Sequence, residues 1–334
     1  MASPLSAVHP ELFHYTGIGS LEGIAKSQTL WATHAAYSND AAEIRAFQAR
    51  LPDILRPGVA RGVQELIRMS SANKLLIEQQ GGEANAIEEI VRGISMGMFN
   101  ALLGGPGAQA FAEPYITSFC TAATDQIAQH GLLSQWRSYG HEGGYAVVFD
   151  TSRLELLLKQ EGEKWGYDLF DGDVIYSSDS DEKIREEFGP DLDELATSIE
   201  KFLTTAGTAD FLEPTYYALI RCACRYKHWG FHEEKEVRIV AIPQNKKVAA
   251  IAKAHGLITA EKPRRVFHRH GTPVPCIHLF EGITTRPDNL LPITRIIVGP
   301  HHEKEKRRRA VEVLLDQYDL NIAVSTSAIP YVGH

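Results

Sequence analysis

The sequence of 334 residues predicts an α+β fold. Short segments rich in β-branched and aromatic residues occur along the whole chain, which is typical of strands. Two long stretches, 57–103 and 181–226, instead place apolar residues at helical spacing. Hydrophobic residues make up 44% of the chain and charged residues 23%, as in ordinary globular proteins. We therefore expect one domain, 1–334, whose β core carries 57–103 and 181–226 as helical insertions.

The first hundred residues alternate predicted strands and helices. A strand at 12–16 is followed by a short helix that Ser20 can cap, and "TLWAT" is expected to form the next strand. A further helix is expected to begin at Asn39 or Asp40. Within 57–103 the helical pattern is interrupted only at Gly81 and Gly82.

The remaining sequence contains most of the predicted strands. They cover 115–120, 145–150, 173–177, 234–242, two segments of 264–280 around a Gly-Thr-Pro turn, and 293–298. A last helix over 303–318 leads into the extended segment "IAVSTS".

Composition and charge exclude several classes of protein. No apolar run approaches the roughly 18 residues of a membrane span, and the N-terminus lacks the basic and apolar segments of a secretory signal. We therefore expect a cytoplasmic protein with no membrane partner. The net charge of -8 argues against a surface that coats nucleic acid, although local basic patches are compatible with it. The sequence contains no P-loop and no G-x-G-x-x-G motif.

The segment "FHYTG" places three polar side chains in one short strand. Alternation puts His14 and Thr16 on one face and Phe13 and Tyr15 on the other. One interpretation is a core or edge histidine whose hydrogen bonds are satisfied. The other is a polar pair that binds a ribose or a phosphate.

A second polar group opens the strand "EKEVRIVAI". Glu234, Glu236 and Arg238 share one face of this strand. A solvated strand end would explain them. Alternatively, a carboxylate beside a positive side chain is suited to stabilise positive charge that develops on a substrate.

Aromatic and hydroxyl side chains in the middle of the chain are further candidates. Arg137 either stacks on Trp136 or Tyr139 as a structural plug, or contacts a phosphate with its guanidinium group. Tyr115 and Ser118 are either plain strand residues or part of a binding pocket.

Two weaker patterns leave other functions open. His268, His270 and His278 could form a metal site, but no acidic residue has the matching spacing, and we expect no metal. "HHEKEKRRRA", from His301, reads as a solvated helix face that could also contact nucleic acid phosphates.

The chain resembles a bacterial family catalogued as domain of unknown function 2971. The matching pieces are "LFHYTGIGSLEGIAKSQTLWATHAAYSNDAAE", "PYITSFCTAATDQIAQHGLLSQWRSYGHEGGYAVVFD", "KHWGFHEEKEVRIV", "ITRIIVGP" and "STSAIPY". They occur in this order over nearly the whole chain. This resemblance implies no activity.

The order of elements is also similar to that of NAD-dependent ADP-ribosyltransferases: a strand with His, a helix, a strand with Ser and aromatic residues, and a late strand opening on Glu-x-Glu. This second resemblance implies an ADP-ribosyltransferase-like fold, with NAD as substrate. His14 would then bind the adenine-side ribose, Tyr115 or Ser118 would border the nicotinamide, and Glu236 would be the catalytic carboxylate.

The same resemblance suggests roles for the remaining candidates. Thr16, beside Tyr15, would contact the nucleotide, Arg137 and Arg238 would neutralise the pyrophosphate, and Trp136 or Tyr139 would stack on a ring. We expect transfer of ADP-ribose to a nucleic acid or protein acceptor, in a toxin or phage-defence effector that an antitoxin or other partner could restrain. A nucleotide-binding sensor is the alternative, and a metal-dependent nuclease is a third hypothesis.

Overall fold

The computed structural model describes residues 4–37, 41–102, 113–139, 144–205, 212–256, 258, 260–269, 271–284 and 289–330. Its strands are β1 (Glu11–Thr16), β2 (Leu30–His34), β3 (Tyr115–Cys120), β4 (Tyr145–Asp150), β5 (Asp168–Asp173), β6 (Ile175–Tyr176), β7 (Tyr226–Lys227), β8 (Glu236–Ile242), β9 (Arg264–Arg269), β10 (Thr272–Leu279), β11 (Ile293–Val298) and β12 (Ala323–Thr326). Its α-helices are α1 (Leu5–Val8), α2 (Ile18–Ser27), α3 (Ala41–Met69), α4 (Ser71–Gln79), α5 (Glu83–Leu102), α6 (Asp125–His130), α7 (Leu133–Tyr139), α8 (Thr151–Trp165), α9 (Asp181–Thr204), α10 (Leu212–Ala223), α11 (Lys246–Ala254) and α12 (Lys304–Gln317). Two 3-10 helices are η1 (Ala35–Tyr37) and η3 (Trp229–Glu234).

The described residues confirm the predicted α+β class. Ten strands form one sheet with the main order β12-β11-β4-β1-β3-β2-β10-β9, and β8 and β5 extend it from β3. The pairing is antiparallel except between β11 and β12. A separate parallel pair, β6 and β7, forms a second, two-stranded sheet. No described helix is long and apolar enough to cross a membrane.

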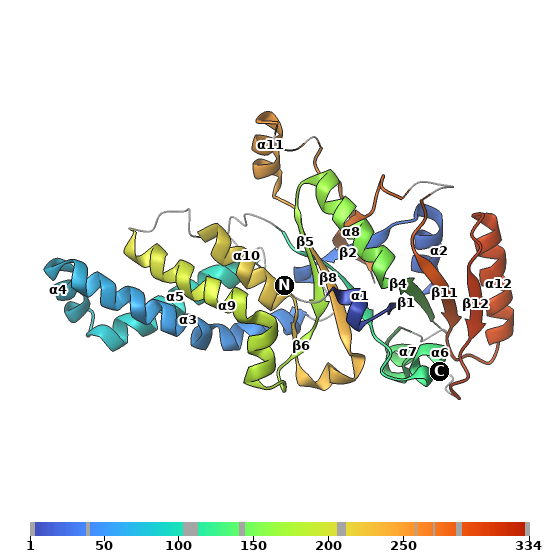
Figure 1. Cartoon of the computed structure of the whole chain (residues 1–334), viewed down its shortest axis with the longest axis horizontal. Coiled ribbons are helices and arrows are strands. Elements are labelled where there is room, and N and C mark those ends of the chain that lie inside the picture. Colours follow the sequence, from blue (N-terminus) through green and yellow to red (C-terminus); the bar gives the residue numbers. More distant parts are fainter. Residues whose placement is uncertain are drawn as a thin grey trace.

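Helices cover the two faces of the sheet differently. One face packs against α2, α8 and α12 through a continuous apolar core. The other face carries two separate apolar clusters, one under α3, α5, α9 and α10 and one under α7. In Figure 1, α3, α4, α5 and α9 project together from one side of the sheet. Polar residues occupy the stretch of sheet between the two clusters.

The helix predicted from Asn39 or Asp40 and the first part of 57–103 form one helix, because α3 begins at Ala41 and continues through Pro52 and Pro57. Proline normally costs an interior helix a hydrogen bond. Here Leu51 and Leu55, one turn apart, are fully buried, and we attribute the continuous helix to that packing. The predicted start at Asn39 or Asp40 lies outside the described residues. The break at Gly81 and Gly82 is present, and a further one separates α3 from α4.

Two other local predictions are wrong in detail. Ser20 does not cap α2, because the helix begins at Ile18 and its N-cap is Gly17. The strand expected over 173–177 is divided between β5 and β6, with Val174 between them. The N–H of Val174 still donates to the carbonyl of Glu236 in β8, the partner strand of β5, whereas the N–H of Ile175 donates to the carbonyl of Arg225, so the chain changes partner at this point.

Gly58 is expected to be essential for the contact between α3 and α9. A Cβ at Gly58 would lie 2.3 Å from the carbonyl oxygen of Ala196 and 2.8 Å from its Cα. Gly58→Ala should therefore lower the free energy of unfolding by roughly 1–3 kcal/mol, because two backbones would have to separate. At Gly93 in α5 a Cβ would meet nothing within 4 Å, so Gly93→Ala is the matched control.

Urea unfolding followed by circular dichroism measures both variants. Gly93→Ala is expected to leave the free energy of unfolding unchanged or to raise it by up to about 1 kcal/mol, since alanine favours helix. Equal values for the two variants would contradict the close approach of α3 and α9.

Candidate functional site

A cleft of about 450 Å³ opens where β1 and β2 part from β3, a volume typical of small-molecule sites. Its lining includes side chains from β1, α2, β2, β3, α7, β7, η3, β8 and β9. Of the residues predicted from sequence, the cleft brings together His14, Tyr15, Thr16, Ser118, Glu236 and Arg238.

The cleft exists because β3 shares one of its edges between two strands. β2 pairs with β3 at Tyr115 and Ile116, whereas β1 pairs with it only at Cys120. Side chains bridge the gap: His14 Nδ1 donates to the carbonyl of Ser118 at 3.0 Å, and Thr117 Oγ1 donates to the carbonyl of Trp31 at 3.1 Å. The gap thus remains open as a cleft while the carbonyls of Ser118 and Trp31 at its edges keep partners.

The hydrogen bond of His14 determines its tautomer. A carbonyl can only accept, so Nδ1 carries the proton and Nε2 of the neutral ring is an acceptor. Burial lowers the pKa of His14, and the hydrogen bond to Ser118 opposes that shift only in part. His14 is therefore a neutral side chain at pH 7 that can accept a hydrogen bond from a hydroxyl.

Glu236 is a buried carboxylate held between two cations. Arg238 donates from Nε to Oε1 at 2.7 Å and from Nη2 to Oε2 at 3.1 Å, and Lys227 Nζ lies 2.9 Å from Oε2. Burial would raise the pKa of Glu236, but Arg238 and Lys227 outweigh it and lower the pKa to about 2. The backbone N–H of Glu236 donates to the Tyr176 hydroxyl at 3.0 Å. Glu236 is thus ionised and fixed in position.

Lys227 is the site residue that sequence reasoning missed. It comes from β7, its Nζ also lies 2.8 Å from Glu234 Oε2, and it sits 4.6 Å from the ring centroid of Phe231. Burial raises the pKa of Glu234, and Lys227 opposes the rise. No spacing rule connects a lysine in a two-residue strand with Glu236, so only the fold shows the contact.

Several predicted residues lie outside the cleft. Tyr115 is buried and its hydroxyl donates to Glu113 at 3.2 Å, and Trp136 is fully buried in the cluster under α7. Arg137 is exposed on α7 and does not line the cleft, and the side chain of Tyr139 lies outside the described residues. The neighbours Gln135 and Ser138 line the cleft instead.

Tyr15 has a structural role in addition to lining the cleft. Its hydroxyl accepts the N–H of Leu132 at 2.8 Å, and its ring packs edge-on against Trp136 at 4.9 Å. The expected alternation is confirmed, because Phe13 and Tyr15 belong to the cluster under α7 whereas Leu12 belongs to the core on the opposite face.

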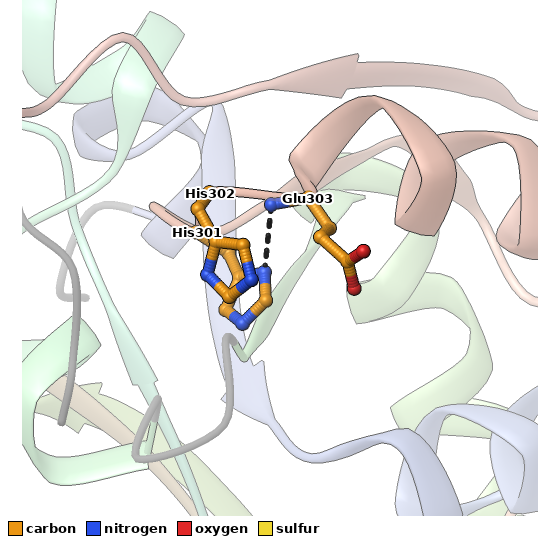
Figure 2. A group of neighbouring side chains, drawn as sticks. All are labelled: His301, His302 and Glu303. Carbon is orange, nitrogen blue, oxygen red and sulfur yellow. Dashed lines mark hydrogen bonds between the residues drawn. The ribbon is translucent and has the colours of Figure 1, made fainter.

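The histidines suggested as metal ligands do not converge in the described residues. His268 is exposed on β9, His278 stacks on Trp31, and His270 lies outside the described residues. His301, His302 and Glu303 form a compact group within 4.8 Å of one another (Figure 2).

Other contacts already engage the donor atoms of His301 and Glu303. His301 Nδ1 accepts the N–H of Glu303 at 3.0 Å, and its Nε2 lies 3.3 Å from Arg307. The Glu303 carboxylate pairs with Lys306 at 2.6 Å. Farther along α12, Arg308 and Arg309 both pair with Glu312, which weakens the case for a phosphate-binding face.

Residues 135–239 match a protein family described as "Protein of unknown function (DUF2971)". This match supports the first resemblance over a segment that includes Lys227, Glu236 and Arg238 but neither His14 nor Trp31. No curated protein and no solved structure matches the chain. The resemblance to ADP-ribosyltransferases therefore has no support from these comparisons and stays a hypothesis.

Acid unfolding is expected to report the ion pairs of Glu236. A carboxylate whose pKa falls from 4.5 to about 2 on folding contributes stability above pH 4.5 and loses it as the pH falls through 2. That shift corresponds to about 3 kcal/mol. Chemical unfolding at a series of pH values should show wild type more stable than Glu236→Gln near pH 6, with the difference narrowing toward pH 2.

The matched control is Glu65→Gln, which changes an exposed carboxylate on α3. The difference in the free energy of unfolding between Glu65→Gln and wild type should not change across the same pH range. If the free energies of unfolding of Glu236→Gln and wild type differed by the same amount at every pH, Arg238 and Lys227 would not hold the carboxylate as described.

Proposed function

We propose that the protein cleaves the bond between nicotinamide and ribose in NAD and transfers ADP-ribose to a nucleic acid or protein acceptor. The observation that carries this proposal is an ionised Glu236 in the same cleft as a neutral, hydrogen-bonded His14. These residues are far apart in the sequence, and the fold places both on the lining of one cleft.

The reaction needs a fixed negative charge beside the ribose. As the C1′–N bond breaks, its electron pair leaves with nicotinamide and the ribose develops oxocarbenium character. A carboxylate that accepts a hydrogen bond from the ribose 2′-hydroxyl stabilises that charge more strongly in the transition state than in the ground state. The acceptor then bonds to C1′ and releases a proton. Glu236 is suited to this task because its low pKa keeps it charged.

Other groups of the cleft fit the binding of a dinucleotide. His14 Nε2 is an acceptor for a ribose hydroxyl, and Arg269 lines the cleft as a cation suited to a phosphate. Arg238, to which the resemblance gives the pyrophosphate, lies in the cleft but is engaged by Glu236 and by the carbonyl of Cys224 at 2.8 Å. We therefore assign Arg238 mainly to positioning Glu236.

An activity of this kind would damage the cell that contains it. We therefore extend the proposal to a toxin or phage-defence effector, with an antitoxin or regulatory partner that restrains it. Toxicity on expression that disappears in Glu236→Gln would support this role.

A nucleotide-binding sensor is the second candidate function. The observation that favours it is that Arg238 and Lys227 already engage both oxygens of Glu236, an arrangement that a pocket used only for binding would also tolerate. A sensor would bind NAD in the same cleft without breaking it.

Glu236→Gln separates the two functions. Wild-type protein is incubated with NAD labelled on the adenine side, alone and with cell lysate, and free nicotinamide and transferred label are measured. We expect Glu236→Gln to lower nicotinamide release by about 100-fold or more, because the substituted amide carries no charge. Binding of ADP-ribose should persist, and Glu65→Gln should behave as wild type.

Circular dichroism confirms that each variant is folded under the assay conditions. Undiminished release by folded Glu236→Gln would remove Glu236 from the reaction. NAD binding without release in wild type, under all conditions, would favour the sensor.

A further inference from the structure

Part of the cleft runs across the strands on the face of the sheet that carries Arg238. Residues paired in register share a face, and so do residues two apart on one strand. Arg238 pairs with Ser118, Ile116 pairs with Thr33, and Thr33 pairs with Cys276. Phe267 pairs with Val274, two residues from Cys276 on β10. Arg238, with Glu236 two residues before it, is therefore on the same face as Phe267, at the opposite end of the cleft.

The order β8-β3-β2-β10-β9 gives the separation of those ends. Four strand spacings correspond to about 19 Å. The cleft is thus elongated, with Glu236 at the β8 end and Phe267 and Arg269 at the β9 end. A ligand made of two units joined by a linker fits this shape better than a single compact group.

The β9 end is aromatic and rigid. Trp31 lines the cleft from β2, the middle strand of this order, and the ring of His278 on β10 stacks on it with 5.1 Å between centroids and 13° between planes. Phe267 lies 5.6 Å from Trp31 at 46°. Thr117 holds the backbone of Trp31 through its carbonyl. The indole orientation is therefore set before any ligand arrives.

We propose that Trp31 and Phe267 bind the adenine ring of the substrate by stacking. This inference rests on the proposed function, which places the bond that breaks beside Glu236 and so puts the nicotinamide at the β8 end, near Phe231. The adenine must then lie at the other end, where Trp31 and Phe267 provide aromatic surface. Arg269, on the same face two residues from Phe267, is placed to contact a phosphate.

This site replaces the stacking role that the sequence suggested for Trp136. Trp136 is fully buried, and its indole Nε1 donates to the carbonyl of His130 at 3.0 Å, so its ring is not open to a ligand. Trp31 is partly exposed and lines the cleft. Stacking of a base on an aromatic ring strengthens binding enough to detect by substitution.

Binding of two half-ligands tests the inference. The dissociation constants of ADP-ribose and nicotinamide mononucleotide are measured by calorimetry for wild type, Trp31→Ala, Trp31→Phe and Phe267→Ala. Trp31→Ala should weaken ADP-ribose binding about tenfold or more and leave nicotinamide mononucleotide unaffected. Trp31→Phe should keep most of the affinity for ADP-ribose. Phe267→Ala, which changes a residue on an edge strand, should weaken ADP-ribose binding less than Trp31→Ala does and should also leave nicotinamide mononucleotide unaffected.

The matched control is Trp229→Ala, which removes an indole that is 60% exposed and does not line the cleft. It should leave both dissociation constants unchanged. Unchanged ADP-ribose binding in folded Trp31→Ala and Phe267→Ala, an equal loss for both ligands, or no binding of ADP-ribose to wild type would each overturn the inference.

Nicotinamide release from NAD is measured on the same preparations. Trp31-dependent binding of ADP-ribose without any release would support the adenine site and contradict the proposed catalysis. Release of nicotinamide with an affinity for ADP-ribose that does not depend on Trp31 would overturn the adenine site alone.

Discussion

The buried ion cluster of Glu236, Arg238 and Lys227 is the interaction on which the candidate site depends. Buried charges are costly unless paired, and breaking such a pair leaves an uncompensated charge. Arg238 is supplied by the same strand, but Lys227 must come from elsewhere. The small sheet of β6 and β7 supplies it, and Tyr176, from β6, also binds the backbone of Glu236. A separate two-stranded sheet thus places the second cation.

The division of one edge of β3 is the second constraint, because it creates a space beside Glu236. Strand pairing at Cys120 alone would leave backbone groups of β3 without partners, which is costly in a protein interior. The opposite edge of β3 needs no such support, because it pairs with β8 along its whole length. Across the open edge, His14 binds the Ser118 carbonyl, so one side chain both supports the gap and lines it.

Local patterns in the sequence were sufficient for the fold class and for half of the site. Alternation placed His14 opposite Phe13, and the two-residue spacing placed Glu236 beside Arg238. Contacts between distant segments could not be predicted this way. The polar neighbours of Trp136 suggest a ring that can bind a ligand, yet its side chain fills the core under α7. No sequence spacing links Lys227 to Glu236, although the two side chains are in contact.

The occupied oxygens of Glu236 are compatible with catalysis. A carboxylate offers about four lone-pair sites. Arg238 takes two and Lys227 one, and the Ser118 hydroxyl also hydrogen-bonds to the group. The cations fix the carboxylate, whereas a serine hydroxyl rotates readily. A ribose hydroxyl that displaced it would exchange one O–H donor for another, so Glu236 would keep its charge, its orientation and its number of hydrogen bonds throughout binding.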